Sequence, residues 1–358
     1  MTTRSILLKV HLWLGLGGSI FLVVLGLTGS VMAFENDIDQ WLHPNLYYVQ
    51  VRPQRASNTE LIHLVEQRFA PARVVTMHFF RQPDLAVLAE LNDTSTVFLN
   101  PYEGRILGRT IGPSRIEKLI GYIHQIHTHL VPNPASTRTA VEIGGLIVEI
   151  AGFILCLLVP IGVVLWLRTK RASIAWRASW FRVCFDAHQV IGIYAALFLF
   201  TAAFTGVMVE QNGAIFRLTH SRPSRFPKLQ SGAAAGASPI SVDRAEAIAR
   251  TAIPNTSVTD VQVPLTPASV FLVVLRVPEE TSEAAHSYVF VDQYSGSVLH
   301  TINFLKDSPG YRVIRFNRSI HTGDIWGTPG HVIASLSSLL LVVMVFTGVV
   351  IWRKKLAR

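Results

Sequence analysis

The chain has 358 residues, of which 50% are hydrophobic and only 15% are charged, and its mean hydropathy is +0.37. A soluble chain normally carries about 25% charged residues, so this composition indicates a membrane protein and argues against an ordinary soluble domain. The formal net charge is +9. Many basic residues flank apolar runs, which is a pattern of membrane topology and not of a nucleic-acid-binding surface. The two cysteines are too few for a cysteine-ligated metal site.

Four long apolar runs follow one another along the chain. They cover residues 6–34, 143–167, 191–209 and 332–352. Each run is long enough, as a helix, to cross a hydrocarbon core of about 30 Å. The first run follows basic residues, as the apolar core of a signal peptide does, but it is longer and no clean cleavage pattern follows it. The sequence therefore predicts a membrane α-helical bundle with four transmembrane helices.

Two more polar segments separate these runs and have α+β patterns. In the first segment we expect a helix over residues 59–69, strands over 74–80, 85–91 and 96–99, and over 100–107 a turn that leads into a further strand. In the second we expect a helix over 241–251, strands over 258–263, 270–277 and 288–291, and the same turn–strand pattern over 292–299. Ser241 is the expected N-cap of the second helix, and residues 232–239 are typical of a flexible linker. Each segment is thus predicted to be a small α+β insert.

These features divide the chain into alternating membrane and polar parts. The parts are helix 1 (1–35), the first insert (36–142), helix 2 (143–168), a basic loop (169–187), helix 3 (188–210), the second insert (211–330), and helix 4 with a basic tail (331–358). The N-terminal tail, the loop and the C-terminal tail are short and basic, so the positive-inside rule places them in the cytoplasm. Both inserts then face outward.

Short matching motifs indicate that the chain is duplicated. A Thr-Gly pair at 28–29 recurs at 205–206, and the pattern Gly-Val-Val-Leu-Trp at 162–166 is similar to Gly-Val-Val-Ile-Trp at 348–352. Two copies of a helix–insert–helix unit, each with an even number of spans, would be related by an axis along the membrane normal. We therefore expect two pseudo-symmetric repeats.

The first and third runs open with the same pattern, a histidine followed by a glycine four residues later. His11 and Gly15 form it in the first run, and His188 and Gly192 form it in the third. In a helix these positions share one face, so the glycine leaves room beside the imidazole for a flat group. We expect His11 and His188 to ligate one haem iron from opposite helices.

Two further histidines stand at matched places before the second and fourth runs. Ile-His-Thr contains His127 in the first copy and His321 in the second. A six-coordinate haem takes one axial imidazole on each side, so we expect His127 and His321 to ligate a second haem near the outer surface. The sequence contains no C-x-x-C-H motif, which excludes covalent c-type attachment. The predicted cofactor is haem b, in two copies.

Several polar residues leave alternatives open. His124 could replace His127 as a ligand, bond a propionate, or bind zinc or copper together with His127 and His129. His331 opens the fourth run and could line the outer pocket. For each of these histidines the plain alternative is an amphipathic residue at the lipid headgroups. Glu149 lies inside the second run and is a functional candidate, with a water-facing interfacial residue as its alternative.

The arrangement as a whole resembles a known family. The paired helix–insert–helix units, the Asp-Gln-Tyr-Ser-Gly turn at 292–296, the His-Thr-Gly at 321–323 and the Thr-Gly pairs are similar to the PepSY-associated transmembrane-helix proteins. Among these, the chain most resembles the ferric-siderophore reductases of the ferrioxamine type, over nearly its whole length. It departs from the pattern at Asn100, where an aspartate is usual, and at His129, where the second copy has glycine.

The resemblance implies a haem-containing protein of the bacterial inner membrane. The termini would be cytoplasmic, and the inserts would be PepSY-like periplasmic domains. Electrons would pass from a cytoplasmic or membrane donor, which the sequence does not identify, to a ferric siderophore, with release of Fe(II). Because the sequence has no Walker A, dinucleotide-binding or nucleophile-elbow motif, the donor is expected to be external. The expected partners are this siderophore, the donor and membrane lipid, without nucleic acid.

Two other classes of protein remain open from the sequence. A siderophore or iron transporter would also have internal repeats and an intramembrane carboxylate. A non-catalytic membrane anchor would present two outer domains to peptides. Neither alternative by itself requires matched histidines at both membrane surfaces.

Overall fold

The chain folds into two compact units. The computed structural model describes residues 2–131, 136–222, 226–232, 237–278 and 286–356, so residues 233–236 of the predicted linker lie outside the described residues. The helical unit comprises Met1–Glu35, Lys118–His220 and Val313–Arg358. The sheet unit comprises Asn36–Glu117 and Ser221–Arg312.

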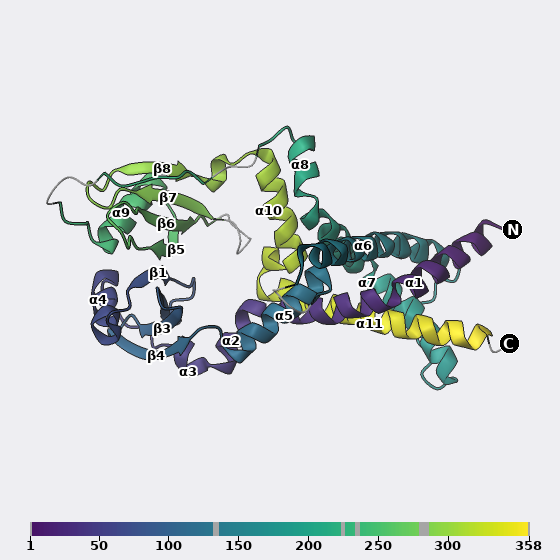
Figure 1. The fold of residues 1–358 in the computed structure, drawn as a ribbon. Helices are drawn as coiled ribbons and strands as arrows, with labels where there is room; N and C mark the ends of the chain where they lie inside the picture. Colours follow the sequence, from purple (N-terminus) through teal and green to yellow (C-terminus); the bar gives the residue numbers. More distant parts are fainter. Residues whose placement is uncertain (1, 132–135, 223–225, 233–236, 279–285, 357–358) are drawn as a thin grey trace. The chain divides into compact units, whose positions relative to one another are not determined.

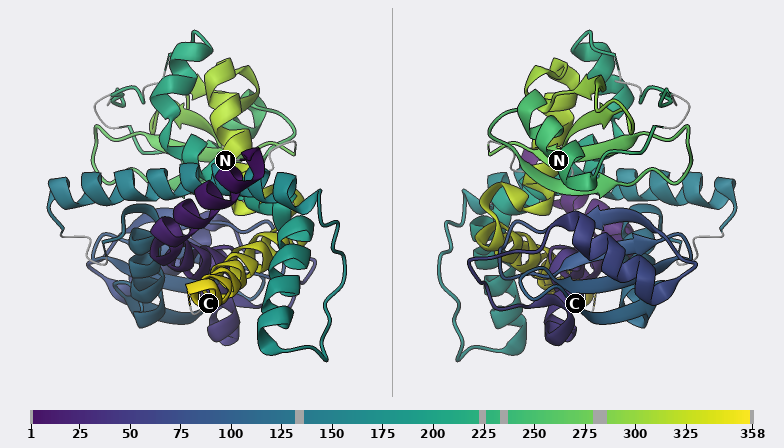
Figure 2. Two further views of the ribbon diagram at one scale, coloured as in Figure 1. Left: turned by 90° about the vertical axis from the view of Figure 1, so that its right-hand side faces the viewer. Right: turned by 90° about the vertical axis from the view of Figure 1, so that its left-hand side faces the viewer.

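Four long helices form the core of the helical unit. They are α1 (Thr3–Met32), α6 (Arg138–Trp166), α7 (Trp180–Glu210) and α11 (Thr328–Leu356). Each is long and apolar enough to cross a membrane, as the sequence predicted, and the chain is a membrane protein. α1 and α7 each pack against both α6 and α11. Both chain termini lie at the same end of this unit (Figure 1), which the left view of Figure 2 turns toward the reader.

Shorter helices, which the sequence analysis did not predict, complete both units. They are α2 (Glu35–Leu42), α3 (Pro44–Tyr47), α5 (Arg115–His129), α8 (Asn212–Leu218), α10 (Pro309–Thr322) and the 3₁₀ turns η1 (Phe304–Lys306) and η2 (Asp324–Trp326). α5 and α10 continue into the helical unit. The sheet unit is therefore narrower than the two predicted inserts, 36–142 and 211–330. This difference arises from tertiary contacts. His127 of α5 is hydrogen-bonded to Thr28 of α1, and Asn317 of α10 donates a hydrogen bond to the Thr205 carbonyl of α7.

The basic loop before α7 is held by a buried carboxylate. Asp186 on α7 is fully buried and forms ion pairs with Arg171 at 3.0 Å and Arg182 at 3.1 Å. Its carboxylate also accepts a hydrogen bond from the backbone N–H of Ala175. The loop is therefore fixed to α7, and two arginine charges offset the cost of burying one carboxylate.

The sheet unit contains one eight-stranded antiparallel sheet in the order β4-β3-β2-β1-β5-β6-β7-β8. The strands are β1 (Val74–His78), β2 (Val87–Leu91), β3 (Ser95–Asn100), β4 (Arg105–Ile111), β5 (Ser257–Gln262), β6 (Phe271–Arg276), β7 (Ser287–Val291) and β8 (Val298–Ile302). Each predicted strand corresponds to one of them. The prediction of two separate inserts was incomplete, because β1 and β5 pair and join both inserts into one sheet.

The joint between the two halves of the sheet is short. β1 and β5 pair at Thr76–Gln262, Met77–Val261 and His78–Asp260. Met77 and Val261 are fully buried, so one apolar contact lies at the centre of the joint. On its other side, Nδ1 of His78 lies 2.5 Å from Asp260, and its Nε2 lies 3.2 Å from Glu90. The joint thus combines apolar burial with a charged cluster.

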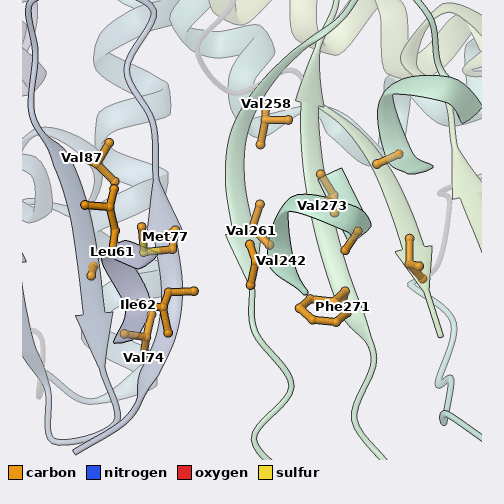
Figure 3. Packing of buried hydrophobic residues seen from close by; sticks show 14 of the residues in the cluster. Leu61, Ile62, Val74, Met77, Val87, Val242, Val258, Val261, Phe271 and Val273 are labelled. Carbon is orange, nitrogen blue, oxygen red and sulfur yellow. The ribbon is translucent and has the colours of Figure 1, made fainter. Parts of the chain in front are cut away.

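Two helices cover one side of the sheet. α4 (Asn58–Phe69) and α9 (Val242–Ala252) pack their apolar faces on residues that point toward them from the strands. Figure 3 shows Leu61 and Ile62 of α4 with β1 and β2, and Val242 of α9 with β5 and β6. Ser241 caps α9 by accepting a hydrogen bond from the Arg244 N–H, which confirms the predicted N-cap.

The two halves make the same turn with different residues. The side-chain oxygen of Asn100 accepts hydrogen bonds from the N–H groups of Tyr102 and Glu103. Asp292 accepts the corresponding bonds from Tyr294 and Ser295, and a further bond from the Gly232 N–H at 2.9 Å. Burial raises the pKa of Asp292, but these backbone donors outweigh it and hold the pKa at about 2. The departure at Asn100 therefore preserves the turn and removes only a charge.

Asp292→Asn should destabilise the sheet unit by about 1–2 kcal/mol at neutral pH, because an amide cannot replace all carboxylate acceptors. In the wild type this contribution is present above the ordinary aspartate pKa and is lost as the pH falls through about 2. Thermal unfolding of the purified protein between pH 5 and pH 2 measures it. Asn100→Asp is the matched control, expected to change stability little. Equal effects of both substitutions would contradict this account.

The His78–Asp260 pair should make the joint weaker at alkaline pH. Burial lowers the pKa of His78, but the carboxylates of Asp260 and Glu90 outweigh it, so the pKa is raised. The stabilisation is therefore complete below the ordinary histidine pKa and is lost as the pH rises through the raised value. Unfolding of the wild type should lose about 1 kcal/mol between pH 6 and pH 9, and His78→Gln should flatten this dependence. The control His63→Gln, on exposed α4 surface, should retain the wild-type slope.

Candidate functional site

The histidines of α1 and α7 lie next to each other. The ring centres of His11 and His188 are 6.3 Å apart, and the ring planes are turned by 88°. Two imidazoles on opposite sides of one metal ion, each with a metal–nitrogen bond of about 2 Å, have ring centres about 6 Å apart. The spacing of this pair is thus the one that a shared metal requires.

A second pair lies at the C-terminal ends of α5 and α10. The ring centres of His127 and His321 are 6.5 Å apart, with 43° between the ring planes. Along α1, His11 and the Thr28 that contacts His127 are separated by about 25 Å of helix. The two pairs therefore lie near opposite ends of the helical unit, at a separation comparable with the thickness of a hydrocarbon core, about 30 Å.

Three of the four imidazoles are bound at Nδ1 by a threonine hydroxyl. The distances are 2.8 Å for His127 and Thr28, 3.1 Å for His321 and Thr205, and 2.9 Å for His188 and Thr347. With Nδ1 occupied, Nε2 is the nitrogen left for a metal. A hydrogen bond at the other ring nitrogen is the usual support of a metal-ligating histidine.

Every one of the four imidazoles also lies against a glycine of a neighbouring helix. A Cβ added at the glycine would approach Cε1 of the ring to 3.3 Å at Gly162 (His11), 3.4 Å at Gly348 (His188), 3.0 Å at Gly29 (His127) and 2.9 Å at Gly206 (His321). The tightest of these contacts leave no space for a larger side chain. The glycines therefore help to set where each ring lies.

A cavity of about 670 Å³ opens around the His11–His188 pair. Both histidines line it, together with four glycines, Gly15, Gly162, Gly192 and Gly348. Cofactor pockets typically measure about 300–1,000 Å³ and have mostly apolar walls. Apolar side chains dominate this wall. Gly15 and Gly192 line the cavity one turn after the histidines, and a Cβ would meet Leu158 at 3.9 Å at Gly15 and Met344 at 2.9 Å at Gly192. Their role beside a flat group stays a prediction.

Four leucines close the cavity toward the middle of the bundle. They are buried in one cluster and come one from each long helix, Leu22, Leu155, Leu199 and Leu341. Leu22 and Leu199 occupy matched positions, between the histidine and the Thr-Gly pair of their helices. This leucine layer is part of an apolar cluster that lies between the two histidine pairs along the helices.

The structure places His124 and His331 against carboxylates. Nδ1 of His124 lies 3.2 Å from Glu35, whose hydrogen bond and charge raise the pKa of His124. Nε2 of His331 lies 3.0 Å from Asp324. The contact with Glu35 engages only Nδ1 of His124, and a carboxylate at that nitrogen is also a usual partner of a metal-ligating histidine, so His124 stays an alternative ligand. Within the described residues, no group of three or more His, Cys, Asp or Glu side chains could hold a metal, which leaves the alternative zinc or copper site without support.

Two other candidates from the sequence are engaged in structural contacts. Glu149 accepts a hydrogen bond from the Gln211 side chain at 2.5 Å, which joins α6 to the end of α7. His129 accepts or donates a bond with Thr128, and its carbonyl lies where a Cβ of Gly144 would stand. Position 144 therefore requires glycine because the α5 and α6 backbones approach closely there.

The sequence analysis found the Thr-Gly pairs but did not predict their role. Thr28-Gly29 and Thr205-Gly206 were recognised as a repeated motif, and Gly162 and Gly348 as parts of another. The recurrence was the available signal. Their contacts with imidazoles on other helices arise only when the helices pack together.

Comparison with known proteins agrees with this architecture. The pattern of the family described as the PepSY-associated TM region matches residues 8–355, nearly the whole chain. A search of curated proteins finds no match to the chain.

Gly206→Val should displace His321, because even a single added carbon would approach its ring to 2.9 Å. A change in a residue that supports a ligand typically costs about ten- to a hundredfold in cofactor affinity. If the chain binds haem as the sequence predicts, protohaem per purified chain, measured while haem is withdrawn by apomyoglobin, should show one weakened centre. Gly17→Val is the matched control, because a Cβ at Gly17 meets nothing within 4 Å. Equal haem loss in both variants would contradict the role of Gly206.

Proposed function

The chain belongs to the family of proteins with a PepSY-associated transmembrane region, and from this premise we propose that it is a haem-dependent reductase of ferric siderophores. One observation carries the proposal: two pairs of half-buried imidazoles, each 6.3–6.5 Å between ring centres, lie at opposite ends of one apolar bundle. One metal centre near each membrane surface divides the apolar barrier into shorter electron transfers.

The residues present fit haem b. Both pairs consist of nitrogen donors, as axial haem ligation requires, and the cavity around His11 and His188, with its mostly apolar wall, suits a flat macrocycle. Arg4 and Lys9 line the same cavity and would bind propionates through charge-assisted hydrogen bonds. Haem, when bound, supplies one-electron chemistry between Fe(III) and Fe(II). The chain contributes the four ligands, their orientation and the exclusion of water by the leucine layer.

The proposed orientation follows from the charges. Basic residues gather at the ends of the long helices that carry the termini and the α6–α7 loop, including Arg4, Lys9, Arg168 and Arg353. We place this end in the cytoplasm of a bacterial inner membrane and the sheet unit in the periplasm. The sheet unit would then consist of two PepSY-like halves, and the matched sequence motifs would reflect two repeats.

The reduction balances as one electron for each ferric ion. Fe(III) in the siderophore accepts one electron and becomes Fe(II), which hard oxygen ligands bind far more weakly, so the metal leaves and the chelator remains intact. A reduced flavin or a quinol, as the donor class, gives two electrons and two protons and therefore serves two ferric ions. The donor delivers electrons at the His11–His188 end, and the siderophore receives them beyond the His127–His321 end.

The two other classes of function have less support. The transporter hypothesis depended on internal repeats and on Glu149 as an intramembrane carboxylate. Glu149 accepts a hydrogen bond from Gln211 in a contact between helices. An anchor for peptide-binding domains accounts for the sheet unit but not for the histidine pairs. Transport without haem would favour the first, and a colourless protein that binds peptides would favour the second.

Purified protein should carry two protohaems per chain and show a reducible b-type spectrum. His11→Ala and His188→Ala should each remove the same half of the haem, and His127→Ala and His321→Ala the other half, because a pair with one ligand binds weakly. Haem and protein content of each variant measure this, with exposed His63→Ala as control. Full haem in all four variants would refute the ligand scheme.

The reduced protein should reduce the Fe(III) of ferrioxamine to Fe(II), which a ferrous chelator traps. One Fe(II) should form per electron supplied. His127→Ala should lose nearly all of this reduction, because the last centre before the substrate is missing. Absorbance of the trapped Fe(II) is the measurement. A haem-containing protein that reduces no ferric chelate would contradict the proposed siderophore substrate but not the proposed electron transfer.

A further inference from the structure

The threonine hydroxyls that contact three of the four imidazoles also lie next to a backbone carbonyl of their own helix. Each hydroxyl lies within hydrogen-bonding distance of the carbonyl four residues earlier on its helix, at 2.7 Å for Thr28, 2.6 Å for Thr205 and 2.9 Å for Thr347. A hydroxyl has one proton to donate. If it goes to the carbonyl, the oxygen must accept from the imidazole, so Nδ1 carries a hydrogen and Nε2 is an unprotonated donor.

The fourth imidazole lacks this support. Gly162 corresponds to Gly348, so the residue before it, Ile161, stands where Thr347 stands in the other half. Isoleucine has no hydroxyl. Within the described residues no hydroxyl reaches the buried Nδ1 of His11, and the backbone of Leu158 is the polar group that lies beside this ring. The two positions are otherwise alike, since a Cβ added at Gly162 or Gly348 would approach the ring to 3.3 or 3.4 Å.

We infer that Thr28, Thr205 and Thr347 are positioning residues that fix the tautomer of a ligand histidine, and that Ile161 leaves His11 as the weakest of the four ligands. The inference rests on the proposed function, since it concerns residues that would support haem ligands. Its consequence is that the two centres differ. The His11–His188 centre, whose ligands have fewer threonine hydrogen bonds, has the higher reduction potential.

The direction follows from the chemistry of the ligand. An imidazole whose Nδ1–H is hydrogen-bonded is a more basic donor at Nε2, and it stabilises the ferric form more than the ferrous form. Losing such a bond therefore favours reduction and raises the potential. The His127–His321 pair has two such bonds and the His11–His188 pair has one.

Redox titration of single centres tests the inference. With His127→Ala as background, only the His11–His188 centre remains, so Thr347→Val should raise its potential and Ile161→Thr should lower it. With His11→Ala as background, Thr28→Val and Thr205→Val should each raise the potential of the other centre, and serine at either position should restore it. We expect a change of about tenfold in the ferric–ferrous equilibrium for each bond, which is about 59 mV for one electron.

Thr251→Val is the matched control, because Thr251 makes the same bond to a carbonyl four residues earlier, at 2.9 Å, on α9 of the sheet unit. It should shift neither potential. Opposite shifts for Thr347→Val and Ile161→Thr at unchanged haem content support the inference. Haem-loaded variants that all keep wild-type potentials would overturn the inference and leave the proposed function intact. A wild-type protein that binds no haem would overturn both.

Discussion

The contact on which the helical unit depends is an imidazole held between a threonine hydroxyl and a glycine of another helix. His188 on α7 is held by α11, His127 on α5 by α1, and His321 on α10 by α7. His11 on α1 meets Gly162 of α6 without the hydroxyl. Each candidate ligand is thus positioned by a helix other than its own, so the packing of the bundle and the geometry of the histidine pairs are one property.

Between the pairs, the middle of the bundle is an apolar cluster that includes one leucine from each long helix. Leucine carries no polar group that would need a buried partner. Nearer the two ends, threonine hydroxyls bond the ring nitrogens of His127, His188 and His321. This separation would suit the proposed electron transfer across an apolar layer.

The sheet unit shows how matched sequence positions can keep a shape while changing charge. Asn100 and Asp292 make the same turn through a side-chain oxygen, although only one of them is ionised. The two halves then meet through three residue pairs of β1 and β5, centred on Met77 and Val261. The helices add a second contact, because Asp243 of α9 accepts hydrogen bonds from the N–H groups of Asn58 and Thr59 of α4, and one apolar core includes residues of both halves.

The sequence by itself determined the local elements and the candidates for chemistry. Apolar length defined the four long helices, alternation defined the strands, and the recurrence of His11 at His188 and of His127 at His321 singled out the four histidines. Only the tertiary structure decided which groups meet. The pairing of β1 with β5 and the hydrogen bond between Thr347 and His188 each join residues that are far apart in the chain. Periodicity describes only neighbours along one element, so it could predict neither contact.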